Sequence, residues 1–195
     1  MAKSAVQILG TPQERTLGAS RQVALLIGAS GFVALCAWKG SISLMPLTPV
    51  PLTLQNFAVL LVGLLLGSRR GFAAMMLYLV AGLAGAPVFS PGPGGVVQLF
   101  GVTGGFLLAY PFVAFVAGYV FEHSKKTFSH AAIAGVLAEA LLFTGGLAWL
   151  YAFTHSLSKA AYFGLYWFVA AEVIKVMLAA GMASRWQRFR NREAA

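Results

Sequence analysis

Charged residues are scarce in this sequence. Asp, Glu, Lys and Arg make up 10% of its 195 residues, whereas a soluble domain normally carries about 25%. Hydrophobic residues account for 59%, and the mean hydropathy is +0.80. So few charges cannot cover the surface of a water-soluble fold, and we therefore expect an integral membrane protein.

The motifs of the common catalytic and cofactor sites are also missing. There is no Gly-x-x-x-x-Gly-Lys-Ser/Thr phosphate loop, and the three histidines do not stand at metal-binding spacings. No nucleophile stands beside a base and an orienting acid in a recognisable motif. Cys36 is the only cysteine, which excludes an intrachain disulfide. We expect neither an enzyme nor a metal site nor a cofactor.

What the sequence does contain is a series of long apolar runs. A helix needs roughly 20 apolar residues to cross a bilayer. The pattern predicts an all-α membrane protein with six transmembrane helices, at residues 21–38, 54–67, 71–86, 106–121, 131–153 and 162–183. Residues 1–20 would form a cytoplasmic N-terminal segment, residues 21–184 the membrane domain, and residues 185–195 a basic cytoplasmic tail.

The basic residues give the orientation. The net charge of +9 is gathered in short clusters between the apolar runs rather than along one face, which argues against nucleic acid as a partner. With both termini in the cytoplasm, the inner segments hold eleven Lys and Arg residues and the outer loops hold two, Lys39 and Lys159. This asymmetry follows the positive-inside tendency.

Three ionisable residues stand inside the apolar runs, where each costs about 2.5–3.5 kcal/mol at the centre of a bilayer. Glu172 and Lys175 share a helix face at i and i+3. Glu139 lies at a similar depth to Lys175, roughly 14 Å from the cytoplasmic end at about 1.5 Å per residue, so the two could meet. The group is either an ion pair that locks two helices or part of a ligand site, and the second reading is favoured because a buried pair seldom stabilises by itself.

Two outer loops are rich in Gly and Pro. Residues 44–55 hold three prolines, and residues 87–105 are uncharged and dense in glycine, so neither is expected to be regular helix. Irregular backbone at membrane depth is tolerated where it lines a cavity. We expect these loops, between the first and second and the third and fourth helices, to form an outward-facing ligand pocket; a solvent-exposed pair of loops is the alternative.

Small residues recur at four-residue spacing in the first run, as Ala24 with Gly28 and Ser30 with Ala34. Such faces allow helices to approach closely in lipid. They either pack within the chain or dock a partner protein.

The loops carry a resemblance that extends over residues 20–185. The series is Pro-Val-Pro-Leu-Thr-Leu-Gln at 49–55, Leu-Leu-Leu-Gly-Ser-Arg-Arg-Gly at 64–71, Gly-Ala-Pro-Val-Phe at 85–89 and Gly-Val-Thr-Gly-Gly-Phe-Leu at 101–107, followed by Trp149-Leu150 and the pair Glu172 and Lys175. It resembles the BioY family, the biotin-specific substrate-binding (S) components of energy-coupling-factor transporters. Val102, Phe106 and Glu172 stand where the family usually has proline, tyrosine and aspartate.

The resemblance implies high-affinity biotin capture and uptake at the cytoplasmic membrane. We expect Glu172 to accept a hydrogen bond from a ureido N–H of biotin and Lys175 to donate to the ureido oxygen, or alternatively to the carboxylate. The remaining ligand contacts expected are ring packing by Trp149, Tyr166 and Trp167, backbone N–H groups of Thr103, Gly104 and Gly105, and a lid formed by residues 49–54 with Gln55.

The resemblance also implies partners. A transmembrane coupling protein and two ABC-type ATPases would energise import, with docking at Ala24 and Gly28. The alternatives are an S component for another vitamin, an intramembrane enzyme, and a structural subunit without a ligand.

Overall fold

A computed structural model describes residues 12–89 and 95–193 of the chain, and they are mainly helical. A two-stranded antiparallel ribbon pairs Ser41 with Thr53 and Ile42 with Leu52. In chain order the elements are α2 (Pro12–Lys39), β1 (Ser41–Ile42), β2 (Leu52–Thr53), α3 (Gln55–Leu66), α4 (Ser68–Leu83), α5 (Gly95–Leu99), α6 (Gly104–Glu122), α7 (Phe128–Thr154), α8 (Leu157–Ala161), the π-helix η1 (Tyr162–Tyr166) and α9 (Val169–Glu193).

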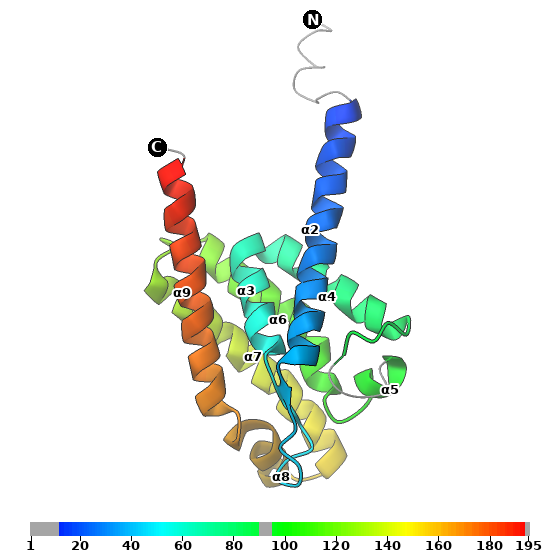
Figure 1. Cartoon of the computed structure of the whole chain (residues 1–195). Coiled ribbons are helices and arrows are strands. Elements are labelled where there is room, and N and C mark those ends of the chain that lie inside the picture. Colours follow the sequence, from blue (N-terminus) through cyan, green and yellow to red (C-terminus); the bar gives the residue numbers. More distant parts are fainter. Residues whose placement is uncertain (1–11, 90–94, 194–195) are drawn as a thin grey trace, which may run out of the picture.

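Helix α6 is the centre of the bundle. It packs against α7, α4 and α3, while α9 packs against α7 and α3, and α2 lies along α4 and α3. The first turn of α2 and the last turn of α9 project from the same side of the molecule, and the β-ribbon and α8 lie at the opposite end (Figure 1). This arrangement places the loop 40–54 over the ends of α6, α7 and α9.

Only some of the helices are long enough to cross a bilayer alone. By length and composition three described helices qualify, Gly18–Lys39, Gly104–Glu122 and Phe128–Thr154, and the pair Leu157–Tyr166 and Val169–Arg192, bent by 44°, makes a fourth. Helix α3 has 12 residues and α4 has 16. At about 1.5 Å per residue these helices measure roughly 18 and 24 Å, less than the ~30 Å of a hydrocarbon core. Each of the six expected apolar runs lies mainly in helix. That all six cross the membrane stays a prediction.

The helix ends differ from the expected ones. Helix α2 already begins at Pro12, within the segment expected to precede the membrane domain, and α9 continues to Glu193 through the basic tail. The bounds of the membrane domain itself stay a prediction. In the sequence, the change from apolar to polar residues was used to place the ends of the first and last membrane runs. The backbone hydrogen bonds of a helix continue through polar residues as well. A further difference is the short helix α5, which lies within the 87–105 segment expected to be irregular.

Glycines bring α3 and α4 close to α6. A Cβ atom on Gly63 would lie 2.4 Å from the carbonyl oxygen of Ala114, and one on Gly118 would lie 2.4 Å from the backbone nitrogen of Ser68. Between α3 and α4, Gly67 adopts φ +85°, a conformation that other residues rarely adopt. Close backbone contact therefore fixes the sharp α3–α4 turn against α6.

Candidate functional site

The loop between α2 and α3 is tied to the C-terminal helices. The Thr48 hydroxyl donates to the carbonyl oxygen of Phe163 at 2.7 Å and accepts from the backbone N–H of Val50 at 3.1 Å. These bonds hold residues 48–50 against the π-helix η1. The expected lid is therefore an ordered part of the fold in this conformation.

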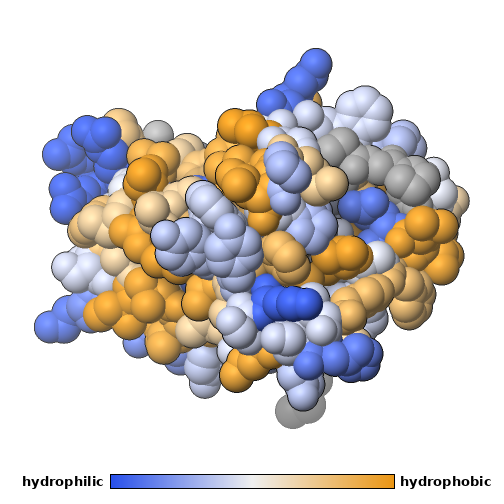
Figure 2. All heavy atoms as spheres, turned by 90° about the horizontal axis from the view of Figure 1, so that it is seen from below, coloured by the Kyte–Doolittle hydropathy of each residue, from blue (hydrophilic) through white to orange (hydrophobic). Residues whose placement is uncertain are grey.

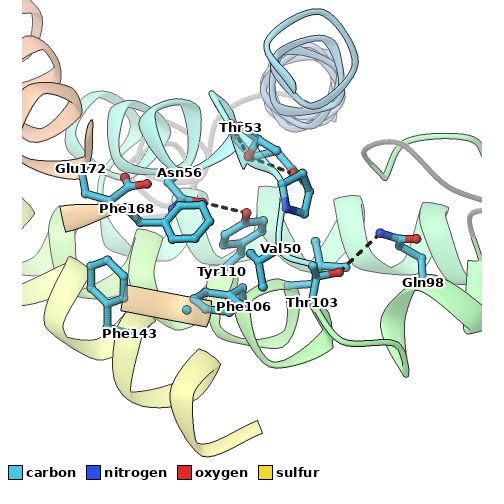
Figure 3. A pocket seen from close by; sticks show the side chains of 14 residues that line it. Val50, Thr53, Asn56, Gln98, Thr103, Phe106, Tyr110, Phe143, Phe168 and Glu172 are labelled. Carbon is cyan, nitrogen blue, oxygen red and sulfur yellow. Dashed lines mark hydrogen bonds between the residues drawn. The ribbon is translucent and has the colours of Figure 1, made fainter. Parts of the chain in front are cut away.

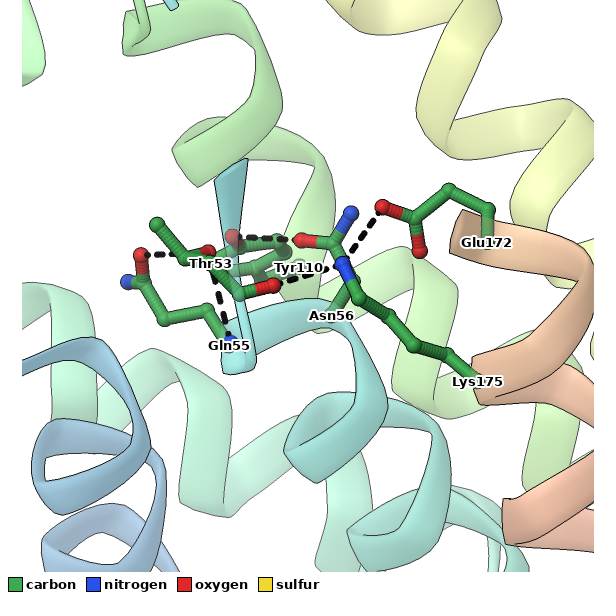
Figure 4. A network of polar contacts seen from close by, with 6 residues as sticks. All are labelled: Thr53, Gln55, Asn56, Tyr110, Glu172 and Lys175. Carbon is green, nitrogen blue, oxygen red and sulfur yellow. Dashed lines mark hydrogen bonds and ion pairs between the residues drawn. The ribbon is translucent and has the colours of Figure 1, made fainter. Parts of the chain in front are cut away.

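Lys175 connects α9 to the end of β2. Its Nζ donates to Oε1 of Glu172 at 2.7 Å and to the carbonyl oxygen of Thr53 at 2.6 Å (Figure 4). Lys175 is 5% exposed and Glu172 3%. The i, i+3 pair expected from the sequence is thus formed, and it is anchored by a backbone acceptor from a distant segment.

A second set of polar side chains lies beside this pair, at the start of α3. Gln55 donates from Nε2 to the hydroxyl of Tyr78 at 2.6 Å, and the Tyr110 hydroxyl donates to Oδ1 of Asn56 at 2.9 Å. The Asn56 amide nitrogen faces the Glu172 carboxylate (Figure 4). Asn56 and Tyr110 were not predicted from the sequence, where an amide next to Gln55 and a tyrosine within an apolar helix carry no distinguishing signal.

Three carboxylate oxygens in this region have no partner that satisfies hydrogen-bond geometry among the described residues. They are Oε2 of Glu172 and both oxygens of Glu139, whose side chain lies in the core at 5% exposure. The contact expected between Glu139 and Lys175 is not a hydrogen bond, because Lys175 is bound to Glu172 and Thr53 instead. Buried acceptors are normally satisfied, so such atoms require an explanation.

A cavity lies beside the Glu172 carboxylate, whose Oε2 has no partner among the described residues. Its volume is about 40 Å³, room for a few water molecules. The side chains around it come from the loops that precede α3 and α6 and from α3, α5, α6, α7 and the start of α9 (Figure 3). The polar lining residues are Thr53, Gln55, Asn56, Gln98, Thr103, Tyr110 and Glu172, and the larger apolar ones are Val50, Phe106, Leu107, Phe143 and Phe168. A cavity that combines large apolar side chains with a small number of polar groups is typical of a small-molecule site.

Of the nine ligand-binding residues expected, Glu172, Gln55 and Thr103 line this cavity. Lys175 lies behind Glu172 and does not line it. Thr103 accepts a hydrogen bond from Nε2 of Gln98 at 3.4 Å, and Gly104 donates its backbone N–H to the carbonyl oxygen of Gly101 at 3.0 Å. The Gly104 N–H is therefore already occupied.

Trp149, Gly104 and Gly105 do not line the cavity. They fix the backbone of the segment that precedes α6. Trp149 Nε1 donates to the carbonyl oxygen of Gly101 at 2.9 Å. A Cβ on Gly105 would lie 2.2 Å from Cβ of Trp149, and one on Gly104 would meet the backbone of Leu99 at 1.9 Å. Gly104 therefore lets the start of α6 pack against Leu99, and Gly105 lets it pack directly against α7.

The other two expected aromatic contacts lie outside the cavity. Tyr166 is 70% exposed and stacks on Tyr162, with ring centroids 5.9 Å apart. Trp167 meets Tyr166 edge-on at 5.2 Å, and its buried Nε1 has no hydrogen-bond partner among the described residues. The end of the molecule that carries the loops and α8 shows hydrophobic and weakly polar residues side by side, with strongly hydrophilic ones in only a few places (Figure 2).

The two small-residue faces of α2 differ. Ser30 is buried and donates to the carbonyl oxygen of Ala74 on α4 at 2.7 Å, so its face packs within the chain. Ala24 and Gly28 instead line an apolar groove against α3, and a Cβ on Gly28 would meet no heavy atom within 4 Å. The second face is open in the isolated chain, as a docking face would be.

Comparisons with known proteins agree with this architecture. The BioY family model matches residues 11–192. A probable biotin transporter BioY of Pyrococcus horikoshii is 36% identical over 156 residues, which cover 80% of this chain and 91% of that protein. The biotin transporter BioY of Thermotoga maritima is 37% identical over 163 residues, which cover 84% and 95%.

The fold has a solved counterpart. The crystal structure of the S-component for biotin from an ECF-type ABC transporter superposes with a TM-score of 0.77 at 23% identity, covering 92% of this chain and 95% of that one. At this identity the likeness shows the fold. Together with the family match over nearly the whole length, it leads to one conclusion: the chain belongs to the BioY family.

Proposed function

We propose that this protein captures biotin in the cell membrane as the substrate-binding component of an energy-coupling-factor transporter. The observation that carries the proposal is the cavity beside Glu172, where a buried carboxylate presents an oxygen without a partner among the described residues. The names of the relatives supply the ligand class, since both proteins compared above are called biotin transporters.

Biotin suits the chemistry of this wall. Its ureido ring offers two N–H donors and one carbonyl acceptor, while its sulfur ring is apolar. Oε2 of Glu172 can accept one ureido N–H, and the Asn56 amide can donate to the ureido oxygen. A charge-assisted hydrogen bond of this kind is worth more than a neutral one. The rings would then lie against Phe106, Phe143 and Phe168.

Lys175 acts differently from the sequence-based expectation in this proposal. Two of its three N–H donors are used by Glu172 and Thr53, so it orients the carboxylate and fixes the loop end at Thr53. Its third donor could reach biotin only after the cavity rearranges, because Lys175 does not line it. The alternative in which Lys175 reaches the carboxylate of biotin predicts a large loss of affinity for biotin methyl ester.

The cavity must enlarge before it can hold the vitamin. Pockets for small molecules measure about 300–1,000 Å³, against about 40 Å³ here. Residues 49–54 run over the cavity, and the phenylalanine side chains of its lining can change rotamer. We infer that movement of this loop admits the ligand and that its return encloses it. Tyr166, Trp167 and Trp149 would come into contact with biotin only through such a rearrangement.

The membrane topology and the partners complete the proposal. Six crossings with both ends in the cytoplasm agree with the basic residues, and the open groove at Ala24 and Gly28 is suited to a helix of the coupling protein that connects to two ATPases. Leucine at both positions should fill the groove and abolish co-purification with that protein while leaving biotin binding intact. If co-purification survives, the docking face lies elsewhere.

Binding measured by isothermal titration calorimetry tests the ligand. Detergent-purified protein should bind biotin stoichiometrically and should not respond to thiamin or riboflavin. Glu172→Gln removes the charged acceptor but keeps the size, and it should weaken binding by at least tenfold; Glu122→Gln, far from the cavity, is the matched control. If the folded protein does not bind biotin but binds another vitamin, that vitamin is the ligand. If it binds none of them, the alternative of a structural subunit without a ligand is favoured.

A further inference from the structure

A second polar site lies where α3 turns into α4. Ser68, Arg69 and Arg70 begin α4, and Tyr119, Glu122 and His123 end α6 beside them; together with Leu66 and Phe115 they surround a hollow of about 470 Å³. Gln55 and Leu66 are the two ends of α3, which is roughly 18 Å long at about 1.5 Å per residue. This hollow is therefore separate from the proposed biotin cavity at the Gln55 end.

The hollow has an excess of positive charge. Arg69 and Arg70 are exposed, and neither forms an ion pair with an acid among the described residues. Glu122 is the one acid in the lining, and its Oε2 accepts the Ser68 hydroxyl at 2.7 Å. Since neither arginine is paired with this carboxylate, both guanidinium groups are available to bind an anion.

An aromatic surface continues from the arginines toward the middle of α6. Arg69 also borders an adjoining hollow of about 350 Å³, lined by Phe72, Phe112 and Phe115. The Phe72 ring meets Phe112 at 5.6 Å and Phe115 at 6.4 Å. The Phe112 side chain is 56% exposed and that of Phe115 38%. These rings present an apolar face that packing within the chain leaves open.

Polarity rises in order along this face of α6. Phe115 stacks on Tyr119 at 5.7 Å, and Tyr119 lies 4.3 Å from the ring of His123, beside the arginines. The spatial order of these side chains, from phenylalanine through tyrosine and histidine to arginine, matches the change from hydrocarbon to headgroup in one leaflet. Tyrosine prefers the boundary between the two. A soluble anion would use only the arginine end of this surface.

We propose that the two hollows bind one anionic phospholipid of the inner leaflet, with its phosphate on Arg69 and Arg70 and an acyl chain along Phe72, Phe112 and Phe115. Basic pockets between membrane helices on the cytoplasmic side bind anionic headgroups in this way. The assignment to the inner leaflet rests on the proposed orientation, and the site itself does not depend on the identity of the transported ligand.

Native mass spectrometry of the full chain in detergent, titrated with phosphatidylglycerol or phosphatidylcholine, tests the proposal. We expect a preference for phosphatidylglycerol. Arg69→Gln with Arg70→Gln should reduce its affinity about 30-fold, from a contribution of about fivefold for each basic residue near an anionic headgroup. The control is Arg188→Gln with Arg190→Gln, an equal loss of charge at exposed positions of α9, which should change affinity less than twofold.

Three results would overturn the proposal: equal binding of the two lipids, equal losses in both double variants, or unchanged binding in the Arg69 and Arg70 variant. A small-anion site is distinguished by inorganic phosphate, which would displace the lipid at millimolar concentration. Phe112→Ser gives a second readout, because it should weaken lipid binding without altering net charge. Size-exclusion profile and melting temperature confirm that each variant is folded, whether or not the protein binds biotin.

Discussion

Replacing Lys175 by methionine tests how the buried polar group supports the fold. The change removes the Nζ atom, which lies 2.6 Å from the carbonyl oxygen of Thr53 and 2.7 Å from Oε1 of Glu172, and keeps most of the aliphatic chain. The Glu172 carboxylate would then be buried without a counter-charge, and the Thr53 oxygen would lose its donor. Removing one partner of a buried ion pair costs about 3–5 kcal/mol.

The assay is thermal unfolding in detergent. For a chain of this length, soluble proteins lose about 2–4 °C of melting temperature per kcal/mol, so we expect a decrease on the order of 10 °C. Adding Glu172→Gln removes the stranded charge and should restore most of the loss. Lys159→Met, at an exposed position on α8, should change stability by less than about 0.5 kcal/mol.

Two outcomes would refute this reasoning. A melting temperature within about 2 °C of the unmodified protein for Lys175→Met would mean that the lysine does not compensate the buried acid. A double variant less stable than Lys175→Met alone would mean that Glu172 stabilises the fold through contacts other than Lys175. Biotin affinity measured on the same samples separates loss of the site from loss of the fold.

Further substitutions probe the packing and the walls of the site. Gly63→Ala should destabilise the protein by about 1–3 kcal/mol because its Cβ would meet the α6 backbone at 2.4 Å, whereas Gly28→Ala, with no heavy atom within 4 Å, should be tolerated in thermal unfolding. Asn56→Leu should weaken biotin binding about tenfold or more by calorimetry, since the amide proposed to donate to the ureido oxygen is lost; unchanged affinity would remove this residue from the site. Trp149→Phe should cost about 1 kcal/mol through its lost 2.9 Å hydrogen bond, and full stability would contradict an anchoring role. Tyr166→Ala should leave the melting temperature nearly unchanged because that side chain is 70% exposed, and a large decrease would indicate packing that the structure does not show.

The sequence predicted the helical regions because apolar run length and helix formation coincide in a membrane protein. It also predicted the contact between Glu172 and Lys175, since a charged residue within such a run is rare enough to be informative. It did not predict that the first and last helices extend beyond the apolar runs, to Pro12 and Glu193. Composition marks where the chain leaves the apolar phase, but a helix continues wherever its backbone hydrogen bonds do.

The second partner of Lys175 could not be predicted in the same way. The acceptor is a backbone carbonyl at Thr53, 122 residues away in the chain, and every residue carries such a group. Asn56 and Tyr110 likewise become recognisable only when α3 and α6 bring them to 2.9 Å. Trp149 was expected to pack on the rings of the ligand, but in the structure it holds the loop at Gly101. An aromatic side chain is suited to both roles, and its position in the sequence does not distinguish them.

The balance of the buried charges argues for a binding site over a structural lock. A lock would pair each acid with a base and satisfy every oxygen, as the contact between Lys175 and Oε1 of Glu172 does. Here the one buried lysine pairs with Glu172 and not with Glu139, and three carboxylate oxygens have no hydrogen-bond partner of acceptable geometry among the described residues. Leaving a buried acceptor unsatisfied costs about 1–3 kcal/mol, and more where it carries charge, so the Glu172 oxygen at the cavity calls for water or a ligand as its partner. A ligand that brings N–H donors to Glu172 would supply such a partner, which supports the proposed site at this cavity.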